Sequence, residues 1–104
     1  EKFIAKLETV LETAIPNSEF NAEIFAEEMH MSRMQLHRKL KSLFGVSATE
    51  FIRNERLKMA ADLLKNDKLS VSEIAYNVGF NDVGYFSKCF KEIYHLSPSD
   101  YQKK

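Results

Sequence analysis

The stretch SEIAYNVGFNDVGYFSKCFKEIYHLSPSDY, residues 72–101, repeats a pattern of apolar residues that already occurs in the first half of the chain. In the first part of the repeat, Phe25-Ala26, Met29 and Met31 correspond to Ile74-Ala75, Val78 and Phe80. After one extra residue in the second copy, Leu36, Leu40-Lys41, Phe44, Val46-Ser47 and Phe51 correspond to Phe86, Phe90-Lys91, Tyr94, Leu96-Ser97 and Tyr101. Each copy predicts a short helix, a tight turn and a longer helix, which together form a helix-turn-helix. A duplication that is only structural is the alternative to a pair of binding motifs.

Capping residues mark where the expected helices begin. A Ser three residues before a Glu or Gln has the capping-box spacing, because each side chain then reaches a free backbone N–H. Pro at the first helical position is a further start signal. The turn of the second copy contains Gly79, which adopts positive φ without strain, whereas the first copy has His30 there at a higher cost. The expected capping residues are Asn21, Ser32, Ser47, Ser70, Asn81 and Ser97, with Gln35, Glu50 and Glu73 completing three capping boxes.

Apolar residues at helical spacing extend over the rest of the chain. They predict a first helix over residues 1–15 and a long helix over residues 48–64. The inward side of the long helix is expected to consist of Phe51, Ile52, Leu57, Ala60, Ala61 and Leu64. Nothing in the sequence predicts a strand. We therefore expect an all-α fold of about seven helices, with two helix-turn-helix subdomains, residues 21–46 and 70–95, joined by a long linker helix within residues 47–66.

The composition is that of one globular domain. With 104 residues, 44% of them hydrophobic, the chain is long enough for one core or for two very small subdomains. The single cysteine, Cys89, excludes an internal disulfide and is typical of a reducing cytoplasm. No apolar run approaches the roughly 18 residues of a membrane span, so we expect no membrane contact by this domain. Because the sequence starts without Met, directly in a helical pattern, we expect it to be a fragment of a longer protein.

Charge is balanced over the whole chain but not along it. Fifteen Lys and Arg accompany fifteen Asp and Glu. Residues 1–29 hold two lysines against seven glutamates, whereas residues 30–58 hold seven Lys and Arg against two glutamates. The most basic stretch, SRMQLHRKLK at residues 32–41, has four cations and no acid. A basic patch of this kind is typical of a nucleic-acid-binding surface, although the net charge alone is not.

The basic stretch is expected to form the second helix of the first helix-turn-helix, which is the helix that enters a major groove. Its buried stripe would consist of Leu36, Leu40, Leu43 and Phe44, which leaves the polar residues on the solvated faces. Arg makes a bidentate contact to guanine, Gln does so with adenine, and Met contacts a thymine methyl group. The predicted DNA-binding residues are Ser32, Arg33, Met34, Gln35, His37, Arg38 and Lys41. An ordinary solvated helix face is the alternative.

The corresponding helix of the second copy, expected from Asn81 to about Tyr94, is much less basic. The residues outside the stripe of Phe86 and Phe90, with the expected cap, form the second predicted DNA-binding set: Asn81, Val83, Gly84, Ser87, Lys88 and Lys91. Val83 can contact a methyl group, and Gly84 leaves room for the close approach of a backbone. The helix residues of this set offer no bidentate base contact, so a purely structural helix is the alternative here.

Residues 72–101 resemble the signature of the AraC/XylS-type transcriptional regulators. The similarity includes the Ile-Ala pair, Gly79-Phe80, Tyr85-Phe86-Ser87, Phe90-Lys91 and Ser97-Pro98. The stretch FIRNERLKMAADLL, residues 51–64, is similar to the linker helix of that family, including Arg56, Ala60 and Leu63-Leu64. The resemblance covers about residues 21–102. The chain is also similar to the C-terminal domains of hybrid two-component regulators of Bacteroidales.

The resemblance implies the sequence-specific, double-stranded DNA-binding domain of a bacterial transcription regulator. Two recognition helices would enter successive major grooves on one face of the duplex. The positions that contact bases in the family are occupied here by Met34, His37 and Arg38 in the first helix and by Val83, Gly84, Ser87 and Lys88 in the second. The chain departs from the family at His95, where the family has glycine, and at Gln102, where it has arginine.

Further partners that the resemblance implies are RNA polymerase and an upstream sensor or effector domain of the same chain. The expected location is cytoplasmic and nucleoid-associated, with a membrane anchor in the full-length protein if that protein is a hybrid sensor.

An enzymatic role is not expected from this sequence. His30, His37 and His95 do not have metal-ligand spacing with Cys89, and no Ser/His/Asp set is indicated, so we expect no catalytic residue, metal or cofactor. The alternatives to DNA binding are a helical phosphotransfer domain, with His37 as its phosphorylated residue, and a protein-binding helical module. Leu40 stands where phosphotransfer domains usually carry Lys. Retention on DNA or heparin that falls with salt distinguishes DNA binding from both alternatives.

Overall fold

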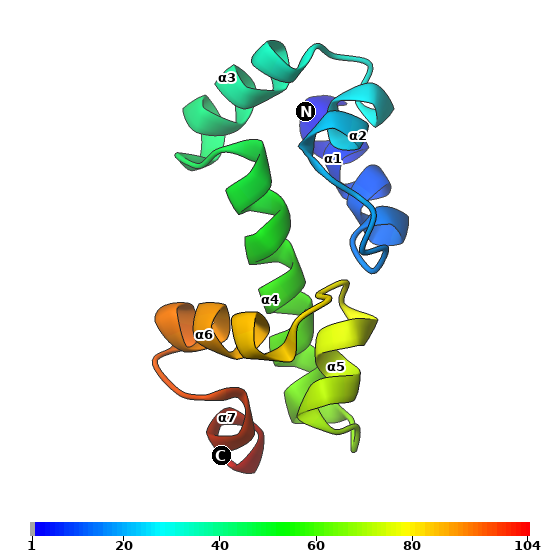
Figure 1. Ribbon diagram of the computed structural model, residues 1–104. Helices are drawn as coiled ribbons and strands as arrows, with labels where there is room; N and C mark the ends of the chain where they lie inside the picture. The colour runs from blue at the N-terminus through cyan, green and yellow to red at the C-terminus, as the bar shows by residue number, and fades with distance from the viewer. Residues whose placement is uncertain (1) are drawn as a thin grey trace.

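Seven helices make up the part of the chain that the computed structural model describes, residues 2–104 (Figure 1). They are α1 (Lys2–Ala14), α2 (Ala22–Glu28), α3 (Arg33–Phe44), α4 (Ala48–Asn66), α5 (Val71–Asn77), α6 (Val83–Tyr94) and α7 (Pro98–Lys103). No strand occurs in this range, so the expected all-α fold is confirmed. Glu1, where we expected the first helix to begin, lies outside the described residues. The long helix α4 continues past its predicted end at Leu64 to Asn66.

The linker helix α4 supplies side chains to two separate cores. Its first half contributes Ala48, Phe51 and Ile52 to a core shared with α1, α2 and α3. Its second half contributes Leu57, Ala60, Ala61 and Leu64 to a core shared with α5 and α6. All six residues of α4 that we predicted to face inward are buried. Each fully buried Leu or Phe contributes about 1.5–3 kcal/mol, so both small cores depend on α4.

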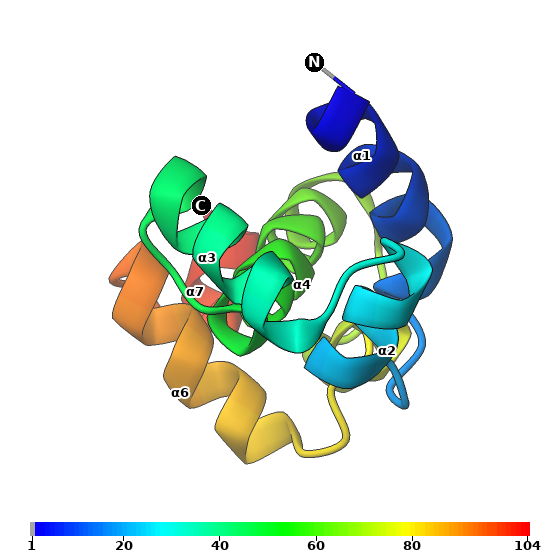
Figure 2. The same ribbon diagram turned by 90° about the horizontal axis from the view of Figure 1, so that it is seen from above.

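The arrangement of the helices follows from these two cores. In Figure 1, α4 runs between an upper group of α1, α2 and α3 and a lower group of α5, α6 and α7. Seen from above, α1 and α2 lie on one side of α4 and α6 lies on the other (Figure 2). The molecule is elongated, with extents of 40, 24 and 23 Å along its principal axes.

Side-chain caps hold the helix starts, with one correction to the prediction. The confirmed caps are Asn21, Ser32, Ser47, Ser70 and Ser97, and those at Ser32, Ser47 and Ser70 form complete capping boxes. For α6 the prediction was wrong by one residue, because Asp82 rather than Asn81 is the N-cap. The Asp82 Oδ1 atom accepts a hydrogen bond from the backbone N–H of Tyr85 at 2.9 Å. The extra residue in the second turn shifts the start of α6 and leaves Asn81 exposed in that turn.

The buried stripe of α3 is shorter than predicted. Leu36 and Leu40 are fully buried, but Leu43 and Phe44 are 44% and 45% exposed. Both lie in the last turn of α3, where the helix extends past the edge of the first core. The Phe44 ring still contacts the ring of Phe51, with centroids 5.1 Å apart, while much of its surface faces solvent.

Arg56 of α4 connects the two halves of the molecule. Its Nε donates a hydrogen bond to the carbonyl oxygen of Ile15 at 3.1 Å. Its Nη2 donates to the carbonyl oxygens of Asn17 at 2.9 Å and Phe20 at 3.2 Å. On the other side, Gly79 lies so close that a Cβ atom there would be 2.8 Å from both Arg56 Nε and the Ile15 oxygen. Gly79 is therefore required for this contact as well as for its φ of +100°.

The C-terminal helix α7 closes the second core at the far end of α4. Lys65 Nζ lies 4.7 Å from the ring centroid of Tyr101, which is a cation–π contact. Gln102 Nε2 donates a hydrogen bond to the carbonyl oxygen of Leu69 at 2.9 Å, so the residue that departs from the family pattern makes a structural contact here. His95 ends α6 in a left-handed conformation, with φ of 65°.

Candidate nucleic-acid interface

The residues predicted to bind DNA at the cap of α3 and along it are all exposed. They are Ser32, Arg33, Met34, Gln35, His37, Arg38 and Lys41. Met34 is 68% exposed, more than any other large hydrophobic side chain among the described residues. Lys39, the remaining cation of the basic stretch, lies with Nζ 5.4 Å from the ring centroid of Phe3 in α1. Lys39 therefore faces α1.

Gln35 has a structural role that limits its part in base recognition. Its Oε1 accepts a hydrogen bond from the backbone N–H of Ser32 at 2.9 Å, and its own backbone N–H donates to Ser32 Oγ at 3.1 Å. A bidentate contact to adenine uses both the oxygen and the nitrogen of the amide. Because Gln35 Oε1 already accepts one hydrogen bond in the capping box, only its second lone pair is left for an adenine amino group, and the box fixes the direction of the amide.

The second predicted set is less uniform. Asn81, Gly84, Lys88 and Lys91 are exposed and Ser87 is half-buried. Val83 is partly buried and packs against the second core, so the prediction that it lies outside the apolar stripe was only partly correct. A Cβ atom at Gly84 would lie 3.2 Å from Asp82 Oδ1, which gives this glycine a local reason beside the capping carboxylate.

Tyr85 is an exposed residue of α6 that sequence reasoning missed. It is 52% exposed, and its ring lies 6.1 Å from that of Phe80. The repeat contains the signal that identifies it, because Tyr85 occupies in α6 the position that Gln35 occupies in α3. The tyrosine hydroxyl group is both a donor and an acceptor, as Gln is.

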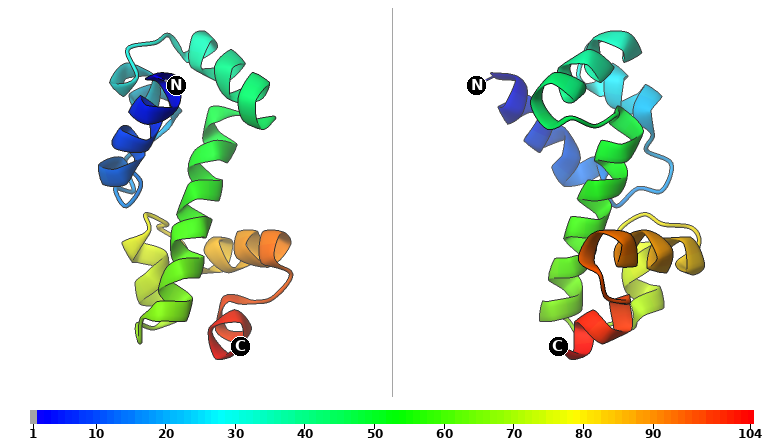
Figure 3. Two further views of the ribbon diagram at one scale, coloured as in Figure 1. Left: turned by 180° about the vertical axis from the view of Figure 1, so that it is seen from behind. Right: turned by 90° about the vertical axis from the view of Figure 1, so that its left-hand side faces the viewer.

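The two recognition helices have the same orientation. Figures 1 and 3 show α3 and α6 running in the same sense, α3 at the start of α4 and α6 beside its second half, with their N-terminal ends on the same side. The longest extent of the molecule is 40 Å, and successive major grooves on one face of B-DNA are about 34 Å apart. Two helices that run in the same sense on one elongated molecule suit two grooves on one face of a duplex.

A cleft of about 630 Å³ lies between the two halves, beside the start of α6. Its lining comes from the start of α2 (Phe20, Asn21), from α4 (Thr49, Arg53) and from the turn before α6 (Asn81, Asp82). Arg53 is half-buried, and its Nε is buried without a hydrogen-bond partner among residues 2–104. Arg53, which lines the cleft, thus has one donor, its buried Nε, that no group among the described residues satisfies.

No helix in the described range is both long and apolar enough to cross a membrane. Within residues 2–104, no group of three or more His, Cys, Asp or Glu side chains is arranged to hold a metal ion. Cys89, on the apolar side of α6, is buried.

Comparisons with known proteins agree with this geometry. Residues 25–104 match the family model described as a helix-turn-helix domain. The chain is 38% identical over its full length to part of the histidine kinase P4 of Formosa agariphila, and it spans 8% of that protein's length.

Two solved structures have the same fold over almost the whole chain. One is the C-terminal domain of the two-component response regulator yesN from Fusobacterium nucleatum, with a TM-score of 0.87, 28% identity, and coverage of 98% of this chain and 99% of that one. The other is the DNA-binding domain of AdpA, a global transcriptional factor, in complex with a target DNA. It has a TM-score of 0.87, 25% identity, and coverage of 97% of this chain and 90% of that one.

Proposed function

This chain belongs to the AraC/XylS-type family of helix-turn-helix domains, and we propose that it binds double-stranded DNA sequence-specifically, as the output domain of a larger bacterial transcription regulator. The observation that carries this proposal is the pair of parallel recognition helices, of which α3 exposes several cations with no acid among them (Figure 3). The likeness to a DNA-binding domain in complex with its target DNA supports it.

We assign different roles to the residues of the two recognition helices. Met34, His37 and Arg38 contact bases in one major groove, and Gly84, Ser87 and Lys88 line the next. Arg33, Lys41 and Lys91 contact phosphates, which increases affinity for all sequences without distinguishing among them. We place four further residues at the edge of the interface, where each lies at the start of a recognition helix or contacts the DNA backbone: Ser32, Gln35, Asn81 and Val83.

The salt dependence of binding tests this proposal. For the isolated domain, log affinity should fall linearly with log salt, by about 0.9 for each phosphate that a cation neutralises. The duplex is obtained by selecting from a random library, and binding to it is then compared with binding to scrambled duplexes. A slope near zero, or equal binding to all duplexes, would contradict the proposal. A phosphotransfer or protein-binding module predicts that result.

The relatives suggest where the domain acts. Because the chain is similar to part of a histidine kinase and to the C-terminal domain of a response regulator, we propose that a sensor or effector domain of the same chain controls it. RNA polymerase is proposed as a further partner, and the nucleoid as the location. The proposal includes no catalytic step, metal or cofactor.

A further inference from the structure

The cleft is lined by residues of both halves of the molecule. Two arginines of α4 line it, and they differ in how their donors are used. Arg56 donates three hydrogen bonds to carbonyl oxygens, one from Nε and two from Nη2. Arg53 lies almost one turn earlier, and its buried Nε has no hydrogen-bond partner in the described residues. A buried donor without a partner is costly, so Arg53 gains free energy by moving to an acceptor.

The surroundings of Arg53 favour an anion that approaches from outside. Thr49 and Asn81 add a hydroxyl group and an amide to the lining, both on exposed residues. The one carboxylate in the lining, that of Asp82, already accepts the N–H of Tyr85 as the cap of α6. The guanidinium group is a planar fork of donors that matches the oxygens of a phosphate.

The cleft is continuous with the proposed interface. Its lining includes Asp82 and Tyr85 at the start of α6, and Asn81 in the turn before that helix. When α3 and α6 occupy successive major grooves, the DNA between them presents its minor groove and the flanking phosphates to α4. We propose that the cleft binds the sugar–phosphate backbone of this intervening segment, with Arg53 as the phosphate-binding residue. This inference rests on the proposed function.

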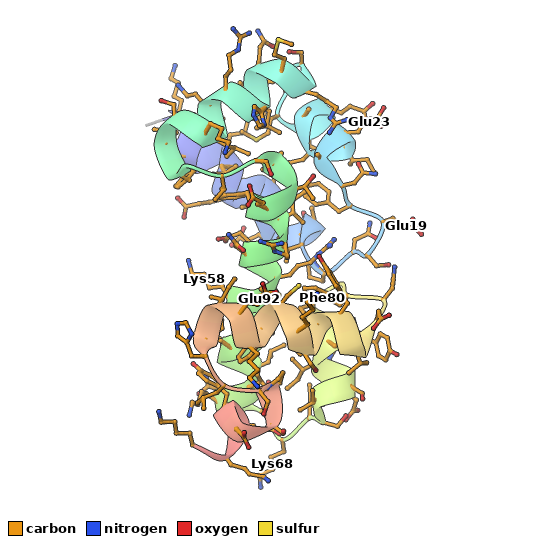
Figure 4. The ribbon with its side chains drawn as sticks, turned by 60° about the vertical axis from the view of Figure 1, so that its left-hand side comes forward. Glu19, Glu23, Lys58, Lys68, Phe80 and Glu92 are labelled. Atoms are coloured by element: carbon orange, nitrogen blue, oxygen red, sulfur yellow. The ribbon has the colours of Figure 1, made fainter. Side chains whose placement is uncertain are left out.

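A charge-removing variant with a matched control on the same helix tests the assignment. Arg53→Gln removes the cation from the cleft. Lys58→Gln removes a cation from α4 that does not line this cleft, and in Figure 4 Lys58 and Glu19 lie on opposite sides of the molecule. In the same view Phe80, which lines the cleft, lies between the two halves. Arg53→Lys keeps the charge and reports on the fold.

The probe is the duplex selected by the unmodified domain. Arg53→Gln should weaken binding to selected and scrambled duplexes alike, by about tenfold, because one charge-assisted hydrogen bond is lost. It should also reduce the salt slope by about 0.9, and Arg53→Lys should restore that slope. Lys58→Gln should change neither quantity. Replacement of the central phosphates by neutral methylphosphonates should weaken the unmodified domain and leave Arg53→Gln without a further loss.

Two results would overturn the inference while the proposed function stands. One is that Arg53→Gln binds with the affinity and the salt slope of the unmodified domain. The other is that methylphosphonates weaken the unmodified domain and Arg53→Gln equally. If the unmodified domain itself shows neither sequence preference nor salt dependence, the proposed function fails, and this inference fails with it.

Discussion

Among the described residues, four have positive φ, and histidine and glycine occupy opposite places in the two copies of the repeat. In the turns, the first copy has His30 with φ of 57° and the second has Gly79 with φ of 100°. At the ends of the recognition helices, the first copy has Gly45 with φ of 75° and the second has His95 with φ of 65°. A residue with a Cβ atom pays roughly 1–2 kcal/mol in this conformation, and glycine does not. The turn at Gly79 also requires the absence of a Cβ atom, because Arg56 occupies the space.

The first prediction concerns the strained end of α6. His95→Gly should stabilise the domain by roughly 0.5–1 kcal/mol, since the relief of strain exceeds the greater flexibility of glycine in the unfolded chain. The reciprocal control is Gly45→His, where a Cβ atom meets nothing within 4 Å, so that only the backbone conformation costs free energy. Denaturant unfolding of both variants measures the effect. A lower stability for His95→Gly would show that the imidazole makes a compensating contact.

The second prediction separates base recognition from attraction to phosphate in α3. Arg38 lies between Leu36 and Leu40 on the exposed side of the helix, whereas Lys41 lies further along it. Arg38→Ala should relax the preference at one base position, because a bidentate guanine contact contributes about 1–3 kcal/mol of discrimination. Lys41→Ala should weaken all sequences equally and reduce the salt slope by about one. The measurement is competition binding with duplexes varied one base pair at a time. An unchanged base preference in Arg38→Ala would exclude its role in recognition.

At the scale of elements, local signals in the sequence predicted the helices well. Most caps and the inward face of α4 depend on residues within a few positions of one another, and these predictions are confirmed. The error at Asn81 was avoidable, since the repeat aligns Asp82 with Ser32 once the extra residue is counted. The errors at Leu43 and Phe44 have another cause. Helical spacing shows which side of α3 is apolar, but not where the core beneath it ends.

The sequence did not predict contacts between segments that are distant along the chain. Arg56 binds carbonyl oxygens of Ile15, Asn17 and Phe20, between 36 and 41 residues away, and no periodicity identifies them. The unsatisfied Nε of Arg53 likewise becomes visible only when the two halves are placed around α4. The exposed residues of the two recognition helices were largely predictable, because they are the positions left over once a helix has buried its apolar stripe.

The third prediction concerns the capping box of α5, in which the carboxylate of Glu73 can titrate. The backbone N–H of Ser70, followed by its side chain, lowers the pKa of Glu73 from its ordinary value of 4.5. Stability from this carboxylate is therefore fully present above pH 4.5 and is lost as the pH falls through the lower pKa of the folded state. Glu73→Gln keeps the geometry and removes the titration. The unmodified domain should thus lose stability relative to Glu73→Gln below pH 4.5, as measured by denaturant unfolding across pH.

A reciprocal change in α3 is the control for this prediction. Gln35 completes the same box with a neutral side chain, so Gln35→Glu should introduce a loss of stability at low pH where none arises from this position now. If the difference in unfolding free energy between the unmodified domain and Glu73→Gln stayed constant between pH 7 and pH 3, the carboxylate would have no linkage to folding.

At the scale of the whole molecule, two small cores are joined by one helix and one arginine. A single helix between two halves would leave their relative orientation dependent on the stiffness of α4 alone. Arg56 adds a connection from α4 to the segment between α1 and α2, and Gly79 of the second half packs against that connection. Burial lowers the pKa of the Arg56 guanidinium, which remains charged at every physiological pH. The spacing of the two recognition helices is therefore set partly by Arg56.

The last prediction tests whether Arg56 couples the two halves. Arg56→Lys retains the charge but loses the fork of donors that contacts three carbonyl oxygens, so the second half should move more freely relative to the first. The unmodified domain should bind its selected duplex far more tightly than the same duplex with one base pair inserted between the two contacted grooves, and Arg56→Lys should discriminate much less between them. Lys58→Gln, on the same helix, should discriminate as the unmodified domain does. Stability is followed in parallel by thermal unfolding, where Arg56→Lys should broaden the transition as the two cores unfold more independently. A variant that kept both a sharp transition and the full spacing preference would show that α4 alone fixes the orientation, and Arg56 would then be a local contact of the first half.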